Sequence, residues 1–474
     1  MNVQTIDDDQ TTLDADHVDA LAERLRGPLL REGDAGYDAA RQVWNGMIDK
    51  RPALIARCTG AADVMDAVRF AREHDLLLAV RGGGHNVSGD AVCDGGLTVD
   101  LSRMNGVHVD PEAQVARVEG GATWGDVDRE TQAFGLATPG GVVSTTGVAG
   151  LTLGGGLGWL RRKHGLSCDN LRSADVVTAE GERVTASADE NPDLFWGLRG
   201  GGGNFGVVTS FEFDLHEVGP EVLFVGVMYP MEEAGRLLPA WRDFMAEAPE
   251  EVSSQAMLWT VPEMEGLPEA AQGRPVCMMG ALYSGDPDEG KQVLGPLREL
   301  SDPVLDMSGV MPYTAVQASQ DHFYPAGELQ YYWKSTELER LDDEVIDALL
   351  DHAAERPSPR THLIVWHQGG AMRRVGPDET AFGDRSAPYL LTIDSTWFDP
   401  ARNEENVAWA REAWQDMQRF SGGGLYLNIA GMSENGEGLV RSAYGGTYDR
   451  LVEVKTRWDP DNVFRMNQNI EPTA

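Results

Sequence analysis

The chain carries Val80-Arg81-Gly82-Gly83-Gly84-His85-Asn86-Val87-Ser88-Gly89, a glycine turn that follows directly on the apolar run 76–80. The apolar run predicts a buried strand, and the segment 51–57 predicts another. Between them, Thr59 precedes a helical pattern in which apolar residues recur three and four positions apart over 64–71. The three segments predict a strand–helix–strand unit whose last strand leads into the glycine turn.

Two further glycine clusters, at 140–158 and 200–206, follow the first one at 82–84. Glycine reaches positive φ and lets backbone N–H groups approach a ligand closely. Successive N–H groups in such turns form concave anion sites that suit a pyrophosphate. Three clusters within one predicted α+β unit therefore indicate a long phosphate-containing ligand, with tight turns alone as the alternative. A Rossmann domain is disfavoured, because no strand–GxGxxG–helix unit is followed by an acidic residue about twenty positions later.

The chain is strongly acidic, with 39 basic against 76 acidic residues and a net charge of −37. The acidic residues are spread along the sequence, and only five of the basic residues are lysines. A carboxylate-rich surface stays hydrated in high salt, where the repulsion between its charges is screened. We therefore expect a protein from a halophile, with an acidic mesophile enzyme as the alternative. Nucleic acid is not an expected partner, because a polyanion would be repelled.

Composition also limits location and metal chemistry. No run of about 18 apolar residues is present, so we expect no membrane span. The acidic N-terminus lacks the features of a secretory signal, so we expect a cytoplasmic protein. The four cysteines show no CxxC spacing, which predicts buried thiols and neither a disulfide framework nor a metal site.

Four blocks of the sequence resemble the berberine bridge enzyme-like branch of the vanillyl-alcohol oxidase superfamily. They are 80–89, 147–171, 194–209 and 444–470, in the family's order. The resemblance implies an α+β fold, with a two-subdomain PCMH-type FAD-binding domain and a substrate domain that has an antiparallel β-sheet backed by helices. The expected divisions are a polar N-terminal arm at 1–30, the FAD-binding domain at 31–216, the substrate domain at 217–435, and a C-terminal segment at 436–474 that returns to the FAD-binding domain.

The resemblance also implies that His85 is joined covalently to the 8α-methyl group of the flavin. An imidazole on a rigid glycine turn can act as the nucleophile for such a bond. Many family members add a second bond from a cysteine, but Val143 stands at that position here. A single linkage is therefore expected, as in the members that are similar to 6-hydroxy-D-nicotine oxidase. Thr146 stands where the family controls oxygen access, so oxidase and dehydrogenase activity both stay open.

Cofactor contacts and catalytic candidates follow from the same blocks. The expected FAD contacts are His85, Arg81, Gly82, Gly83, Gly84, Asn86, Ser88, Thr145, Thr146, Gly147, Gly150, Val208, Tyr448 and Asn467. Plant members carry a Glu or Gln at the position of Thr392, which cannot serve as a base. Asp394 lies two residues further along the strand and should share its face. Asp394, Tyr426 and Asn428 are therefore the catalytic candidates, with His367 as a further possibility.

These observations predict an oxidoreductase that takes a hydride from an alcohol or amine carbon of a small organic substrate. The electrons would pass through FAD to O2 or another acceptor. One alternative is a non-covalent FAD dehydrogenase of the 2-hydroxy-acid type, against which His85 argues. The other is a flavin-carrying electron-transfer protein without turnover. The many aromatic residues of the second domain favour a substrate pocket, although the residues name neither the substrate nor the oligomeric state.

Overall fold

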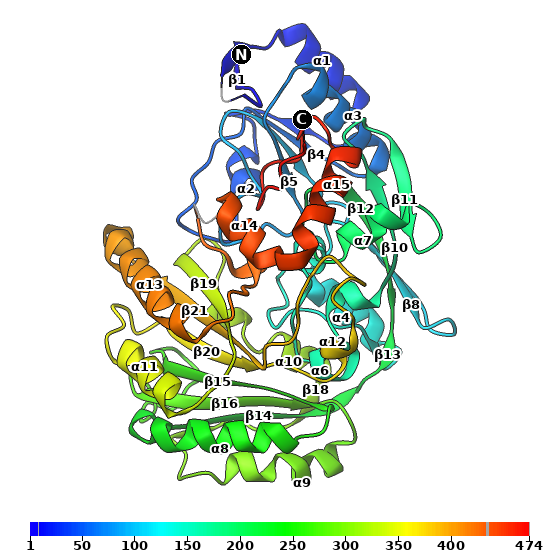
Figure 1. The fold of residues 1–474 in the computed structure, drawn as a ribbon. Coiled ribbons are helices and arrows are strands. Elements are labelled where there is room, and N and C mark those ends of the chain that lie inside the picture. The colour runs from blue at the N-terminus through cyan, green and yellow to red at the C-terminus, as the bar shows by residue number, and fades with distance from the viewer. Residues whose placement is uncertain (8, 433–435, 474) are drawn as a thin grey trace.

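The computed structural model describes residues 1–7, 9–432 and 436–473, and it confirms the expected α+β architecture. Figure 1 shows the N-terminal and C-terminal segments together at one end of the molecule and a large sheet with its helices at the other end. Most of the first 216 residues therefore lie apart from the middle of the chain, and the C-terminal helices return to them.

A small four-stranded sheet holds the first glycine turn. Its order is β3 (Leu29–Leu30), β4 (Leu54–Arg57), β6 (Leu97–Asp100) and β5 (Leu78–Arg81), with β4, β6 and β5 parallel. Helix α3 (Ala61–Glu73) joins β4 to β5, so the predicted strand–helix–strand unit is confirmed. The turn that carries His85 begins where β5 ends.

The first 30 residues, expected as a polar arm, pack against this sheet. They form the hairpin of β1 (Asn2–Gln4) and β2 (Gln10–Thr12) and the helix α1 (Ala15–Arg24). Val18 and Leu21 of α1 are fully buried in the same core as β4. An apolar pair three residues apart lies on one face of a helix, which is why this otherwise charged segment docks.

A second sheet has the order β11 (Arg183–Ser187), β10 (Leu171–Val177), β12 (Val207–Asp214), β8 (Val115–Glu119) and β7 (Val107–Asp110), all antiparallel. The C-terminal helix α15 (Tyr448–Trp458) contacts α7 (Pro192–Leu198) and shares its core. Lys455 of α15 is fully buried, and its ammonium group donates to the carbonyl of Asn204 at 2.9 Å and to the carboxylate of Asp459 at 2.6 Å. The bond to Asn204 attaches the C-terminal segment to the third glycine cluster.

The second half of the chain forms a large antiparallel sheet. Its order is β17 (Leu305–Asp306), β14 (Glu221–Pro230), β16 (Pro275–Tyr283), β15 (Val252–Thr260), β20 (His362–His367), β21 (Tyr389–Trp397) and β19 (Gln330–Leu338), with β18 (Gly309–Pro312) also paired to β14. Helices α8 (Ala234–Glu247), α9 (Pro287–Arg298), α11 (Asp343–Ala354) and α13 (Asn403–Met417) cover one face.

Side chains alternate between the two faces of β21. Leu391, Ile393 and Trp397 pack under the helices. Leu390, Thr392 and Asp394 therefore point to the opposite face, which lies toward the glycine-rich half. The expected sheet backed by helices is confirmed, and its open face is the one that can build a site.

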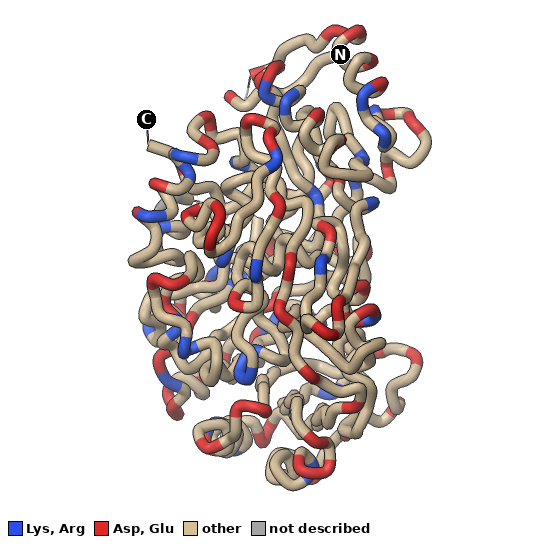
Figure 2. The backbone as a smooth tube through the Cα atoms, turned by 90° about the vertical axis from the view of Figure 1, so that its right-hand side faces the viewer, with Lys and Arg blue, Asp and Glu red and all other residues tan. Residues whose placement is uncertain are grey.

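In the view of Figure 2, Asp and Glu are scattered along the whole length of the chain. No helix in the part of the chain that the structure describes is both long and apolar enough to cross a membrane.

Candidate functional site

A cavity of about 300 Å³ lies between the glycine loops and the open face of the large sheet. It brings together residues that are more than 300 positions apart in the sequence. Thirteen of the predicted site residues line it: Gly82, Gly83, Gly84, His85, Asn86, Thr146, Gly147, Gly150, Val208, Asp394, Tyr426, Asn428 and Asn467.

The other four predicted contacts lie outside the lining. Arg81 donates from its guanidinium to the carbonyl of Ala40, and burial lowers the pKa of Arg81. The Ser88 hydroxyl donates within its own loop to the side-chain oxygen of Asn86 and to the carboxylate of Asp90. Thr145 is exposed. Tyr448 is only 3% exposed and packs in the core around α15, with the guanidinium of Arg441 4.2 Å above its ring.

Two glycine loops touch each other backbone to backbone at the cavity wall. A Cβ atom on Gly83 would lie 2.5 Å from the Cα atom of Gly147, and one on Gly147 would collide with the backbone of Gly83. By contrast, a Cβ atom on Gly150 would meet nothing within 4 Å. The tight pair keeps both loops at the cavity, and the open position leaves room for a ligand to lie against the backbone. This shape fits the pyrophosphate of a dinucleotide.

His85 presents its imidazole at the cavity wall. The ring stacks on Trp44 with 4.2 Å between centroids and 17° between planes. Its Nε2 atom is buried and has no hydrogen-bond partner among the described residues. Burial lowers the pKa of His85 to about 4, so the imidazole is neutral near pH 7. A neutral ring with an unpaired nitrogen is the form that can attack an electrophile.

The Tyr426 hydroxyl is fixed by three donors. Its oxygen accepts from the backbone N–H groups of Gly156 at 3.1 Å and Leu157 at 3.2 Å. It also accepts from the Asn428 side-chain amide at 2.8 Å. Burial raises the pKa of Tyr426, and the three donors act in the opposite direction. Asn428 also donates to the carbonyl of Leu151, so it holds Tyr426 against the second glycine cluster.

Asp394 lies in the middle of β21 and is 5% exposed. Its Oδ1 atom has no hydrogen-bond partner among the described residues. Burial raises the pKa of Asp394 to about 7, despite a hydrogen bond from Thr392. The residue is opposite Trp333 on β19 and opposite His362 on β20. A carboxyl group that titrates near neutrality on a cavity wall is suited to take up and release a proton.

The pair of Tyr324 and His362 beside Asp394 was missed in the sequence. The Tyr324 hydroxyl is 3.2 Å from Nδ1 of His362, and Tyr324 lines the cavity. Burial, together with Arg356 and Arg360, lowers the pKa of His362 to about 3, so the ring is neutral. A neutral imidazole can accept a hydrogen bond from the Tyr324 hydroxyl, which leaves the phenol oxygen as an acceptor. Only the register of the sheet and the loop after α10 (Tyr313–Gln317) bring these residues together.

The cavity wall carries no lysine or arginine among the residues that the structure describes. Its charged side chains are the carboxyl groups of Asp90 and Asp394. Trp333, Ile364 and Trp366 supply an apolar surface beside Asp394. His367 lies elsewhere, since its ring packs against Trp241 and Tyr389 outside the cavity.

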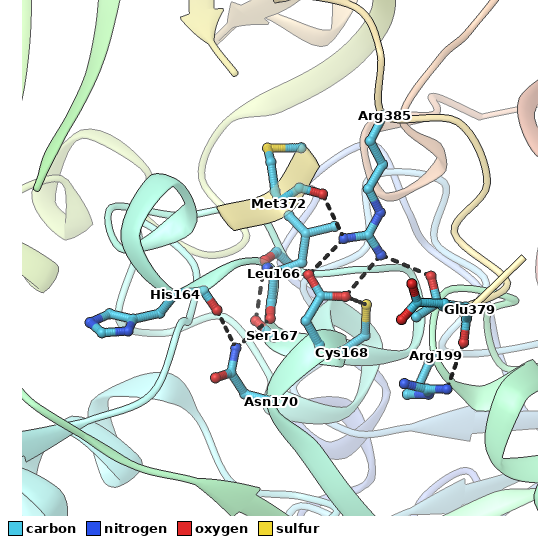
Figure 3. A network of polar contacts seen from close by, with 12 residues as sticks. His164, Leu166, Ser167, Cys168, Asn170, Arg199, Met372, Glu379 and Arg385 are labelled. Carbon is cyan, nitrogen blue, oxygen red and sulfur yellow. Dashed lines mark hydrogen bonds and ion pairs between the residues drawn. The ribbon is translucent and has the colours of Figure 1, made fainter. Parts of the chain in front are cut away.

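A buried ion pair connects the two halves next to the site (Figure 3). Arg385 donates to both carboxylate oxygens of Asp169, at 2.6 and 2.8 Å, and the two side chains are 2% and 8% exposed. Arg385 also donates to Thr380 and to the carbonyl of Met372. The segment before β21 is thereby fastened to the loop that follows the second glycine cluster.

None of the four cysteines lines the cavity. All four cysteines are free and buried. Among the described residues, no group of three or more His, Cys, Asp or Glu side chains could hold a metal ion.

Comparisons with known proteins agree with the geometry. A family model described as an FAD binding domain matches residues 52–187, and one described as berberine and berberine like matches residues 425–471. An FAD-linked oxidoreductase of Dictyostelium discoideum is 31% identical over 96% of this chain and 97% of its own length. The (R)-6-hydroxynicotine oxidase of Paenarthrobacter nicotinovorans is 33% identical over 94% of this chain and 97% of its own length. The crystal structure of 6-hydroxy-D-nicotine oxidase from Arthrobacter nicotinovorans superposes with a TM-score of 0.84, at 32% identity, over 95% of this chain and 98% of that one.

Proposed function

The chain belongs to the FAD-linked oxidoreductases of the berberine-like family, and from this premise we propose that His85 holds the FAD covalently while Asp394 takes the substrate's proton. The substrate would be a small amine or alcohol. The observation that carries the covalent part is the neutral imidazole of His85 on the glycine loop, whose Nε2 atom has no hydrogen-bond partner among the described residues.

The attachment would join an imidazole nitrogen of His85 to the 8α-methyl carbon of the flavin. One N–H bond and one C–H bond would be lost, and O2 would take up the two protons and two electrons as hydrogen peroxide. Val143 lines the cavity. It stands where the family resemblance places the cysteine that makes a second flavin bond, and it offers no thiol. A single linkage follows.

FAD, once bound, supplies the acceptor for the hydride that leaves the substrate carbon. The protein must remove the accompanying proton. Asp394 with a pKa of about 7 is partly ionised at neutral pH, whereas the pKa of Tyr426 lies above its ordinary value of 10.0. Asp394 is therefore the better base, and Tyr426 with Asn428 shapes the cavity wall beside it.

The polarity of the cavity indicates how the substrate binds. Asp394 and the Tyr324 oxygen are acceptors, so the reacting group would bind as a hydrogen-bond donor, as an amine or alcohol does. A 2-hydroxy acid would bring its carboxylate next to Asp394, away from the backbone N–H groups of the glycine loops and without a lysine or arginine among the described lining residues, where the charge would be costly. The site thus argues against the 2-hydroxy-acid alternative, and the built cavity argues against simple electron transfer.

Acid precipitation tests the covalent link. After trichloroacetic acid, the flavin of the wild-type protein should stay in the pellet, and a tryptic flavopeptide should contain His85. His85→Ala should lose the acid-stable flavin, and His108→Ala, which changes an exposed histidine of β7, should keep it. Release of all FAD from the wild-type protein would refute the linkage.

Flavin bleaching without oxygen tests the substrate class. Cyclic amines, alcohols, sugars and 2-hydroxy acids are added in turn to the oxidised protein. Amines or alcohols should bleach the flavin, and readmitted O2 should restore its colour with release of peroxide. Bleaching by 2-hydroxy acids alone would contradict the proposed polarity of the site.

A further inference from the structure

Trp44 is held between two aromatic rings from different halves of the molecule. On one side lies the imidazole of His85, at 4.2 Å. On the other side lies the phenol ring of Tyr331 from β19, with 3.7 Å between centroids and 16° between planes. Trp44 is 4% exposed and Tyr331 is fully buried. The indole thus forms the middle layer of a three-ring stack that ends on the proposed flavin anchor.

Backbone bonds hold the same segment to the glycine turn. The N–H group of Trp44 donates to the carbonyl of Gly84 at 3.0 Å, immediately before His85. The side-chain amide of Asn45 donates to the carbonyl of Val87 at 2.7 Å, two residues after His85. Hydrogen bonds from residues 44 and 45 therefore hold the turn both before and after the histidine.

The opposite side of the segment binds the substrate domain. Asn45 donates to the carbonyl of Tyr331 at 2.9 Å and accepts from its N–H group at 3.1 Å, so it occupies the place of a neighbouring strand. The N–H group of Gly46 donates to the carbonyl of Leu329 at 2.9 Å. The indole N–H of Trp44 donates to the carbonyl of Tyr324 at 3.0 Å. Asn45 is 1% exposed, so these bonds are shielded from water.

The stack restrains the orientation of the His85 ring from outside the residue. No hydrogen bond among the described residues holds its Nε2 atom, and the ring's other polar contact is with the backbone of His85 itself, so the restraint that another residue places on the plane of the imidazole is the contact with Trp44. A histidine side chain without such a restraint samples about three χ1 wells and a broad, roughly two-fold χ2. Loss of the indole would therefore lower the fraction of molecules that hold the ring in the reactive orientation by about three- to six-fold.

We propose that residues 44–46 form a clamp between the two domains that orients His85, so that docking of the substrate domain speeds flavin attachment. Trp44 is a positioning residue in this scheme, since it acts through His85. The inference rests on the proposed covalent link. It adds that β19, far from the glycine turn in sequence, controls how fast that link forms.

The rate of attachment tests the clamp without any substrate. Apoprotein from riboflavin-limited cells is mixed with FAD in air, and the acid-insoluble flavin is followed with time. Trp44→Leu and Tyr331→Ala should each slow attachment about three- to six-fold. Trp44→Phe and Tyr331→Phe keep a stacking ring and should restore a rate near that of the wild type.

Trp241→Leu is the matched control. Trp241 is also a buried indole with its N–H group bonded, at 2.8 Å to Ser254, but it lies on the helix-covered face of the large sheet. This variant should attach flavin at the wild-type rate even if its melting temperature falls. Each variant is melted as well, and rates are measured where it is fully folded.

The outcomes separate the two proposals. A wild-type protein that releases all its FAD in acid overturns the covalent link itself. A wild-type protein with acid-stable flavin, beside a Trp44→Leu variant that attaches flavin equally fast, overturns the clamp alone. If Trp44→Leu attaches flavin slowly but Tyr331→Ala attaches it at the wild-type rate, the inference that attachment depends on the substrate domain is overturned.

Discussion

Replacing Asp394 by asparagine should stabilise the protein increasingly as the pH rises, while it removes the proposed base. The substitution keeps the shape of the side chain and deletes its charge. Asp394 has a pKa of about 7 in the folded protein, compared with 3.8 in an open chain, because burial disfavours the carboxylate. Between these two values the unfolded chain is ionised and the folded protein keeps its proton. The wild type therefore loses stability as the pH rises through this window, and the loss levels off above pH 7.

The size of the effect follows from the shift. Each pKa unit corresponds to about 1.4 kcal/mol, so a rise of about three units costs the wild type about 4 kcal/mol at pH 8. The asparagine side chain of the variant does not titrate, and the cost of its buried amide does not vary with pH. For an unfolding unit the size of the expected substrate domain, 217–435, 1 kcal/mol shifts the melting temperature by about 2–4 °C, so the gap between variant and wild type should widen by roughly 8–16 °C from pH 4 to pH 8.

The assay is a series of thermal melts between about pH 4 and pH 8.5, followed by circular dichroism for both proteins. Asp128→Asn is the matched control, since burial also raises the pKa of Asp128 to about 7 and its partner is Gln317 outside the cavity. It should show the same widening gap and normal flavin reduction. Asp394→Asn should in addition reduce the flavin about 10²–10⁴ times more slowly.

Two results would refute the reasoning. If the difference in melting temperature between Asp394→Asn and the wild type stays constant from pH 4 to pH 8, the carboxyl group titrates normally. Flavin reduction within two-fold of the wild type would mean that another group takes the proton.

Three further predictions concern the neighbouring contacts and the surface. Tyr426→Phe leaves three donors without their acceptor, so the free energy of unfolding measured in urea should fall by about 1–3 kcal/mol. An unchanged urea midpoint would contradict these three hydrogen bonds. Arg385→Met leaves the buried carboxylate of Asp169 without its partner and should lower the free energy of unfolding by about 3–5 kcal/mol. The double variant Arg385→Met with Asp169→Leu should recover most of this loss, and equal losses in the single and double variants would contradict the role of the ion pair. Raising NaCl from about 0.1 to 2 M should raise the melting temperature, because salt screens the repulsion within a protein of net charge −37. A melting temperature that falls with added salt would argue against a halophilic surface.

Much of the fold was predictable because its signals are local. Strand-like stretches at 222–229, 254–261, 276–283, 363–368 and 389–397 predict five strands, and β14, β15, β16, β20 and β21 lie within about two residues of those bounds. Strand β19 was missed, because Lys334, Ser335 and Glu337 interrupt its apolar pattern. Lys334 is nevertheless buried, with its ammonium 3.9 Å from the ring centroid of Trp414. That contact joins residues far apart in the sequence, so no local pattern reveals it.

The site, like the fold, has residues that the sequence indicates and residues that only the folded structure reveals. Glycine clusters indicate cofactor loops from the sequence alone, because the freedom of glycine at positive φ is a property of the residue itself. Trp44, Tyr324 and His362 gave no such signal. Each acquires its role from partners brought together by folding, as when Trp44 meets Tyr331 or Tyr324 meets His362.

The sequence by itself determined the cofactor loops, the histidine that ends the first of them and the alternating strands of the large sheet. Tertiary structure alone decided that Asp394 is buried, with one oxygen that has no partner among the described residues. It also decided that the imidazole of His85 is neutral and stacked, and that the Tyr324 hydroxyl is paired with a histidine. The physical reason is that conformational preference belongs to a residue and its neighbours in sequence. Burial, pairing and the pKa values that follow from them belong to contacts that exist only once the two halves have closed on each other.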